Sequence, residues 1–342
     1  MRPRYAGLAL AVALAAGAAP GAEPPPAATV VAEPEEINAF VACAKPARRA
    51  DILLDTASRR LHQTVCGAAL WFDGLFGERD LDAALKSYGH IELAHAWSEF
   101  SGHESRVRFI ARTQLPAMQH RLSAFIGVDD EDAYARDRSE GNALRSRRRA
   151  TDRETFLVGL GFAGVTRDRF QSDFQVGVRH VTRPEAFAQN RFNYIPYSSR
   201  SNRLVLRITP FWNNRDHFGA TTHTAFDHIL DEAFLLRWST AVTKTEVAAG
   251  TDWRSALILY QNLRGTHALA YEAFIRGQSV APEPLVEFGV RTVYRRPLLW
   301  QERLFGEFVL GYSWPRDDPA LEREGAVDVG AGVEMPFGKR TK

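Results

Sequence analysis

Two stretches near the C-terminus, Leu304–Trp314 and Gly325–Phe337, constrain the fold more than any other part of the sequence. Apolar residues recur at every second position, and polar or small residues fill most positions between them. The apolar sets are Leu304, Phe308, Leu310, Tyr312 and Trp314 in the first stretch, and Val327, Val329, Ala331, Val333, Met335 and Phe337 in the second. Side chains of a β-strand point alternately to its two faces, so each stretch predicts a strand with one apolar face and one polar or small face.

The same alternation recurs back to about Tyr88 and marks about fourteen strands. Their predicted bounds are 88–99, 105–115, 119–127, 154–164, 169–180, 186–197, 203–213, 219–230, 234–245, 252–262, 266–277, 283–295, 301–314 and 324–337. Most are close to the ~9–11 residues that a tilted strand needs to cross a bilayer. A soluble β-sandwich would show polar exposed faces instead. The sequence therefore predicts an all-β fold, a closed antiparallel transmembrane β-barrel with lipid outside and a polar lumen inside.

The polar faces of the predicted strands line the lumen. Charges are tolerated there because the lumen is wet or because they pair, whereas Arg or Lys on the lipid face costs ~2–4 kcal/mol at the midplane. The predicted lining contains more Arg than acidic residues, which favours anions. It consists of Glu92, Arg106, Arg108, Arg112, Asp173, Arg179, Arg207, His223, Asp227, Arg237, Glu272, Arg276, Glu287, Arg291, Arg295, Glu307, Asp328 and Glu334.

Aromatic residues at or near strand ends predict a girdle at the membrane surfaces. They are Tyr260, Tyr271, Tyr294, Tyr312, Trp212, Trp238, Trp253 and Trp314. One residue conflicts with the strand pattern, because Pro210 lies in the middle of the seventh predicted strand. Its missing N–H predicts a β-bulge there.

The chain before the barrel predicts export and a small helical segment. The sequence divides into a signal peptide (1–22), a Pro- and Ala-rich linker (23–36), a helical cap or plug (37–87), the barrel (88–338) and a short tail (339–342). The first part has a basic start, a short apolar core and a small-residue exit, as secretory signals do. The helical segment could cap the barrel on the periplasmic side, enter the lumen, or lie on the membrane surface.

Only two cysteines are present, Cys43 and Cys66, and both lie in the helical segment. Two nearby cysteines in an exported protein most often form a disulfide, which we predict here. They are too few for a metal site, and the ten His lack metal-ligand spacing. We therefore expect no metal and no cofactor. The net charge of +2 gives no reason to expect nucleic-acid binding.

These features resemble the outer-membrane β-barrel proteins of Gram-negative bacteria. The export signal and the alternating strands match, as does a last strand, Val327–Phe337, that ends in an aromatic residue. That ending is similar to the signal read by the barrel-assembly machinery, although the tail 339–342 departs from members that end on the aromatic itself. The resemblance implies an outer-membrane location, a periplasmic N-terminus, contact with outer-membrane lipid and lipopolysaccharide, and the assembly machinery as a partner during biogenesis. It implies no particular activity.

The spacing of the connections adds to this picture. With periplasmic termini and an even strand number, short inner turns alternate with longer and more charged outer loops, as such barrels require. The longest predicted outer loop is Asp129–Arg153, which is acidic at its start and basic at its end. It could constrict the pore, contact lipopolysaccharide, or simply be a solvated loop.

Three classes of function are open. A charged, wet lumen predicts a porin-like channel for small polar or anionic solutes. The alternative is a structural or envelope-interaction barrel whose N-terminal helices bind a periplasmic partner. A lipid-modifying enzyme needs a Ser activated by an adjacent base near the lipid face, and the candidates are His95, His228, Ser98 and Ser239. Since His95 is predicted to face outward and Ser98 inward, we predict no catalytic residues.

Overall fold

A computed structural model of the chain describes residues 87–115, 121–130, 154–180, 183–263, 267–280, 284–298, 304–316, 320 and 322–338. All of them belong to one compact unit, Asn38–Lys342. The predicted signal peptide, linker, helical segment, Cys43–Cys66 disulfide and tail lie outside these residues and stay predictions. No helix within the described ranges is long and apolar enough to cross a membrane.

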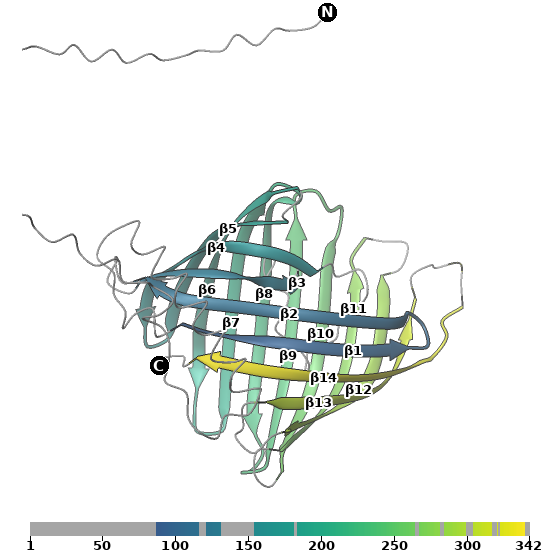
Figure 1. The fold of residues 1–342 in the computed structure, drawn as a ribbon. Coiled ribbons are helices and arrows are strands. Elements are labelled where there is room, and N and C mark those ends of the chain that lie inside the picture. Colours follow the sequence, from purple (N-terminus) through teal and green to yellow (C-terminus); the bar gives the residue numbers. More distant parts are fainter. Residues whose placement is uncertain are drawn as a thin grey trace, which may run out of the picture. The chain divides into compact units, whose positions relative to one another are not determined.

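The described residues form a closed antiparallel barrel of fourteen strands, which confirms the predicted fold class (Figure 1). The strands are β1 Tyr88–Ser98, β2 Gly102–Leu115, β3 Leu122–Asp130, β4 Glu154–Arg167, β5 Phe170–Arg179, β6 Glu185–Ser198, β7 Asn202–Asn213, β8 His217–Ile229, β9 Phe234–Thr245, β10 Thr251–Asn262, β11 Ala268–Gln278, β12 Leu285–Pro297, β13 Phe305–Pro315 and β14 Ala326–Gly338. Each strand pairs with its neighbours in the sequence. The sheet closes where β14 pairs with β1, the yellow and dark-blue strands of Figure 1.

One face of each strand is apolar and exposed. Leu93 on β1, Val290 on β12 and Leu310 on β13 are each more than half exposed, and the residues before and after them in the sequence point to the other face. Exposed apolar side chains also occupy outward positions on the other strands of the barrel. An exposed apolar band of this extent is unfavourable in water and suits the hydrocarbon core of a membrane.

The predicted bulge at Pro210 is wrong. Pairing of β7 with β8 runs without a shift through Pro210 and Ala220, and the register with β6 is the same on both sides of Pro210. The irregularity lies instead between Tyr194 and Tyr197 of β6, a segment that contains Pro196. A residue's N–H points to only one neighbouring strand, so the ladder can lose one donor without an inserted residue.

The outward face can be tested with a charge at two depths. We expect Leu310→Arg, in the middle of β13, to lower the free energy of unfolding in lipid bilayers by ~2–4 kcal/mol relative to Leu310→Ala. Phe218→Arg near the start of β8 should cost about 0–1 kcal/mol relative to Phe218→Ala, since it lies near a membrane surface. Denaturant titrations of protein refolded into vesicles measure both differences. Equal small costs at the two depths would contradict a lipid-facing exterior.

Candidate functional site

The inward face of the strands is charged along most of its circumference. It carries all the residues expected from the sequence to line the lumen, including buried Arg179, Glu272 and His223. Among the described residues the expected excess of Arg is not found, because their inward positions hold as many carboxylates as Arg side chains. The two sets are Arg106, Arg108, Arg112, Arg179, Arg191, Arg203, Arg207, Arg237, Arg254, Arg276, Arg291 and Arg295, against Glu92, Glu104, Asp129, Asp173, Glu185, Asp227, Asp252, Glu272, Glu287, Glu307, Asp328 and Glu334.

The predicted lining contained too few acidic residues, and Asp129 shows how one was left out. Asp129 was assigned to the start of a loop, but β3 extends to Asp130. The Asp129 side chain lies 3.6 Å from Arg108 Nε, and Glu92 of β1 lies 3.7 Å from the same guanidinium. A single Arg on β2 therefore bridges carboxylates from both neighbouring strands.

Ion pairs join neighbouring strands within β8–β13. Their closest N–O distances are 2.5 Å for Arg237–Asp227, 2.7 Å for Arg276–Glu287, 3.1 Å for Arg291–Glu272 and 2.6 Å for Arg295–Glu307. Arg295 also reaches Glu334 of β14 at 2.9 Å, across the intervening strand. Opposite charges facing each other across a ladder stabilise the sheet and allow charge inside the barrel.

The two partners of these pairs differ in exposure. Arg237 is 38% exposed and Asp227 12%, whereas Arg276 is 33% exposed and Glu287 15%. Arg295 is also 38% exposed, against 15% for Glu307 and 22% for Glu334. The Arg side chain is thus the more exposed partner in these three pairs. A solute beside these three pairs would meet cations first, whereas the carboxylate is the more exposed partner in the Arg106–Glu104, Arg108–Asp129 and Arg179–Glu185 pairs.

The Arg291–Glu272 pair is different, because both side chains are buried, at 7% and 0% exposure. It lies beside an apolar cluster on the inner wall. The cluster consists of Ala256, Ile258, Ala270, Val293 and Val309, with Tyr260 and Phe274 packed against it. This part of the wall therefore has an apolar layer with an ion pair embedded beside it, which sequence alternation alone did not reveal.

Inward aromatic rings on β10, β11 and β13 lie under Arg side chains, as does Phe125 of β3, whose ring centre is 5.8 Å from the guanidinium carbon of Arg112. The guanidinium carbon is 4.3 Å from the Phe274 ring centre for Arg291, 4.7 Å from Phe305 for Arg295 and 5.8 Å from Tyr260 for Arg237. Cation–π contact of this kind holds a guanidinium flat against a wall. The expectation that Tyr260 belongs to the girdle is wrong, because its even-numbered position on β10 faces inward with Ile258. The other seven predicted girdle residues lie on the outward face.

A second inward apolar cluster lies on β2–β6 and contains Ile110, Phe125, Leu157 and Phe187. Glycines on neighbouring strands make room for its rings. A Cβ on Gly159 would lie 2.5 Å from Phe125 Cζ, and one on Gly177 would lie 3.0 Å from Phe187 Cε1. The rings therefore occupy space beside the backbone, and do not need to project to the centre of the barrel.

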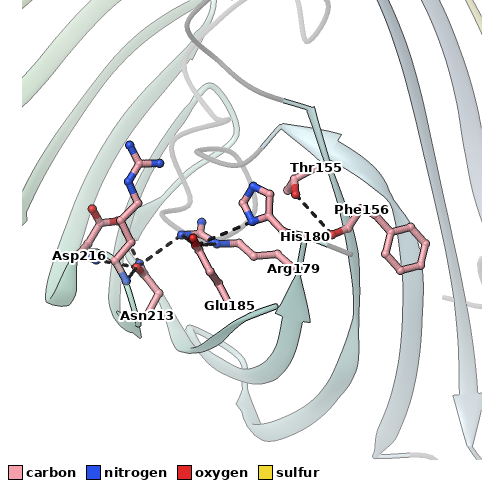
Figure 2. A network of polar contacts seen from close by, with 8 residues as sticks. Thr155, Phe156, Arg179, His180, Glu185, Asn213 and Asp216 are labelled. Carbon is pink, nitrogen blue, oxygen red and sulfur yellow. Dashed lines mark hydrogen bonds and ion pairs between the residues drawn. The ribbon is translucent and has the colours of Figure 1, made fainter. Parts of the chain in front are cut away.

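At one rim, Arg179 ties three strands together (Figure 2). It binds Glu185 of β6 at 2.9 Å and Asn213 of β7 at 3.5 Å, and Asn213 donates a hydrogen bond to Asp216 at 3.1 Å. His180 lies beside this network, 3.8 Å from Glu185, with a φ of 60°. Left-handed backbone at a non-glycine residue is uncommon and costs free energy, which the polar contacts around Arg179 help to offset at His180.

The residues considered for an enzyme do not meet. Ser98 and Ser239 are buried on the inward face, while His228 forms a 2.7 Å hydrogen bond with Asn202. The fourth candidate, His95, instead contacts a serine of β2 that the sequence analysis did not consider. Among the described residues, no group of three or more His, Cys, Asp or Glu is arranged to hold a metal ion.

Comparison with known proteins gives only distant likenesses. No protein-family model and no curated protein sequence matches the chain. Among solved structures, an anion-selective porin from Comamonas acidovorans is similar with a TM-score of 0.46 and 10% identity, over 73% of this chain and 98% of that one. The outer-membrane channel DcaP of Acinetobacter baumannii has a TM-score of 0.46 and 7% identity, over 73% and 96%. A bacterial polysaccharide outer-membrane secretin has 0.44 and 9%, over 73% and 98%.

The buried and exposed pairs should differ in their effect on stability. We expect Arg291→Leu to lower the free energy of unfolding by about 3–5 kcal/mol, because Glu272 loses its cation inside the wall. Arg295→Leu should cost about 1 kcal/mol or less, since that pair is accessible to water. Denaturant titrations of the two variants give the comparison. The double variant Arg291→Leu/Glu272→Leu should recover most of the loss, and a double variant as unstable as Arg291→Leu alone would contradict this account.

Proposed function

We propose that the protein is an outer-membrane channel for small polar solutes with a preference for anions, and that its termini lie on the periplasmic side. The apolar exterior supports a membrane location, and the charged inner wall supports a path for water and polar solutes. The single observation that carries the proposed anion preference is that the Arg side chain is more exposed than its carboxylate partner in the Arg237, Arg276 and Arg295 pairs.

The positions of these cations along the barrel suit a stepwise path. Arg237 is near the beginning of β9 and Arg295 near the end of β12, so antiparallel pairing brings both toward one mouth. Arg276, near the end of β11, lies toward the other mouth. Conduction requires sites that attract a solute but release it to the next site. Each Arg is already partly neutralised by a carboxylate, which keeps a passing anion from binding too tightly.

Selectivity measurements test this proposal. We expect Arg237→Gln, Arg276→Gln and Arg295→Gln each to lower the anion-to-cation permeability ratio roughly twofold, since a charge at ~10 Å in water contributes about 0.4 kcal/mol. The triple variant should prefer cations, because Asp227, Glu287, Glu307 and Glu334 remain. Reversal potentials in planar bilayers across a salt gradient measure the ratio, and the differences should shrink at high salt.

Arg200→Gln is the matched control, because Arg200 is exposed in the turn between β6 and β7 and lies outside the strands. It should leave the permeability ratio close to that of the unmodified protein. Folded protein that inserts into bilayers without conductance would exclude a channel. A ratio that stays the same in the triple variant would exclude these Arg side chains as its selectivity determinants.

A further inference from the structure

Three polar side chains interrupt the apolar outward face of the β1–β2 hairpin. His95 Nδ1 lies 2.8 Å from Ser105 Oγ, and His103 Nδ1 lies 3.4 Å from His95 Nε2. The two imidazole rings are stacked, with their centres 5.5 Å apart and a 26° angle between planes. All three side chains are exposed, and their neighbours on this face include the exposed apolar Leu93 and Val107.

The pairing of β1 with β2 builds this arrangement. His95 and Ser105 are direct cross-strand partners, and His103 is the outward residue two positions before Ser105 on β2, opposite Trp97. Directly opposed residues have Cβ atoms about 4.5–5.5 Å apart, which is a suitable separation for a hydroxyl to reach an imidazole. The hairpin itself is short, because Glu99–Ser101 alone connects the two strands. The three groups are therefore held by paired strands and not by a long loop.

We propose that Ser105, His95 and His103 form a hydrolytic site for acyl esters of membrane lipids. A serine becomes nucleophilic when an adjacent base takes its proton and a third group orients that base. Here Ser105 would be the nucleophile and His95 the base. His103 would be a positioning residue that accepts a hydrogen bond from His95 Nε2–H.

The reaction needs only the lipid and water. Ser105 Oγ bonds to the ester carbonyl carbon while its proton passes to His95 Nδ1. The ester C–O bond then breaks, the lipid alcohol leaves with the proton from His95, and the acyl group stays on Ser105. Water attacks the acyl-serine with His95 again as base, which releases the fatty acid and restores the free hydroxyl.

The position of Ser105 on the outward face of the barrel favours a lipid substrate. Solutes in the lumen cannot reach the outward face, whereas lipids surround it. Ser105 is three residues into β2, about 10 Å of strand from the hairpin turn, since a strand rises ~3.3 Å per residue. Trp97, 39% exposed beside His103, is the type of residue that sits where acyl chains meet head groups. Ester carbonyls of glycerolipids and of acylated saccharides lie at this level of a membrane.

A fluorophosphonate probe tests for an activated serine, because it reacts with such a nucleophile and not with an ordinary hydroxyl. The full chain in detergent micelles should be labelled at Ser105, as located by peptide mass analysis. Ser105→Ala should abolish labelling, and His95→Ala should slow it at least about 100-fold. Ser98→Ala and Ser239→Ala, at buried inward serines, should label like the unmodified protein.

The role of His103 is tested by replacing its hydrogen-bond acceptor. His103→Leu should slow labelling about tenfold, and His103→Asp, which still accepts a hydrogen bond, should restore most of the rate. A purely structural histidine would give no such rescue. Circular dichroism and bilayer conductance of each variant report whether the barrel is intact, so loss of labelling with normal conductance separates this site from the proposed channel.

Vesicles of phosphatidylethanolamine and phosphatidylglycerol supply the second readout. Protein refolded into them should release fatty acid and lysophospholipid, and Ser105→Ala should not. Hydrolysis of an acylated lipopolysaccharide, but not of these phospholipids, would support the hydrolytic site and identify esters of acylated saccharides as its substrate. Absence of labelling in the folded, unmodified protein, or labelling that persists in Ser105→Ala, would overturn the proposal and leave three side chains that only satisfy one another's hydrogen bonds.

Discussion

The pairing of β1 with β14 is the interaction on which the remaining structure depends. An open sheet in hydrocarbon would leave a row of N–H and C=O groups without partners, at several kcal/mol for each group. The two strands pair along their length, from Tyr88 with Gly338 to Ser98 with Asp328. This register also decides which residues enter the lumen, since a slip of one residue would turn every side chain to the other face.

Closure has an electrostatic consequence at the same seam. It sets Glu92 directly opposite Glu334, and two like charges facing each other destabilise a sheet. Each is offset by a guanidinium from another strand, Arg108 at 3.7 Å and Arg295 at 2.9 Å. The long Arg side chain lets a cation reach over a neighbouring position while its carboxylate partners stay near the wall. Aromatic rings such as Phe305 lie under that cation. Because these rings occupy inward positions, the inner wall is less polar than the alternating sequence pattern suggests.

Much of the fold could be read from the sequence because a strand's two faces have a period of two, and that period is visible within a single strand. The bounds of β9, for example, were predicted without error. What failed needed information from neighbouring strands. Tyr260 is aromatic and near a strand end, yet its contacts with Arg237 place it inside. Pro210 needed knowledge of which neighbour its missing donor faces, and the meeting of His95 with Ser105 needed the register of β1 with β2, which neither strand encodes alone.

That register links the two faces of one hairpin. Glu92 opposes Arg108 on the inside, and three residues further along β1 His95 opposes Ser105 on the outside. Because 92 and 95 differ in parity, a single alignment of the two strands produces both pairs, and no other alignment produces either. The charge pair inside therefore resists the slip that would separate the imidazole from the hydroxyl outside. Substitutions at even positions of β1 and β2 should act on the lumen and those at odd positions on the lipid side, so the two proposed activities can be separated within one rigid element.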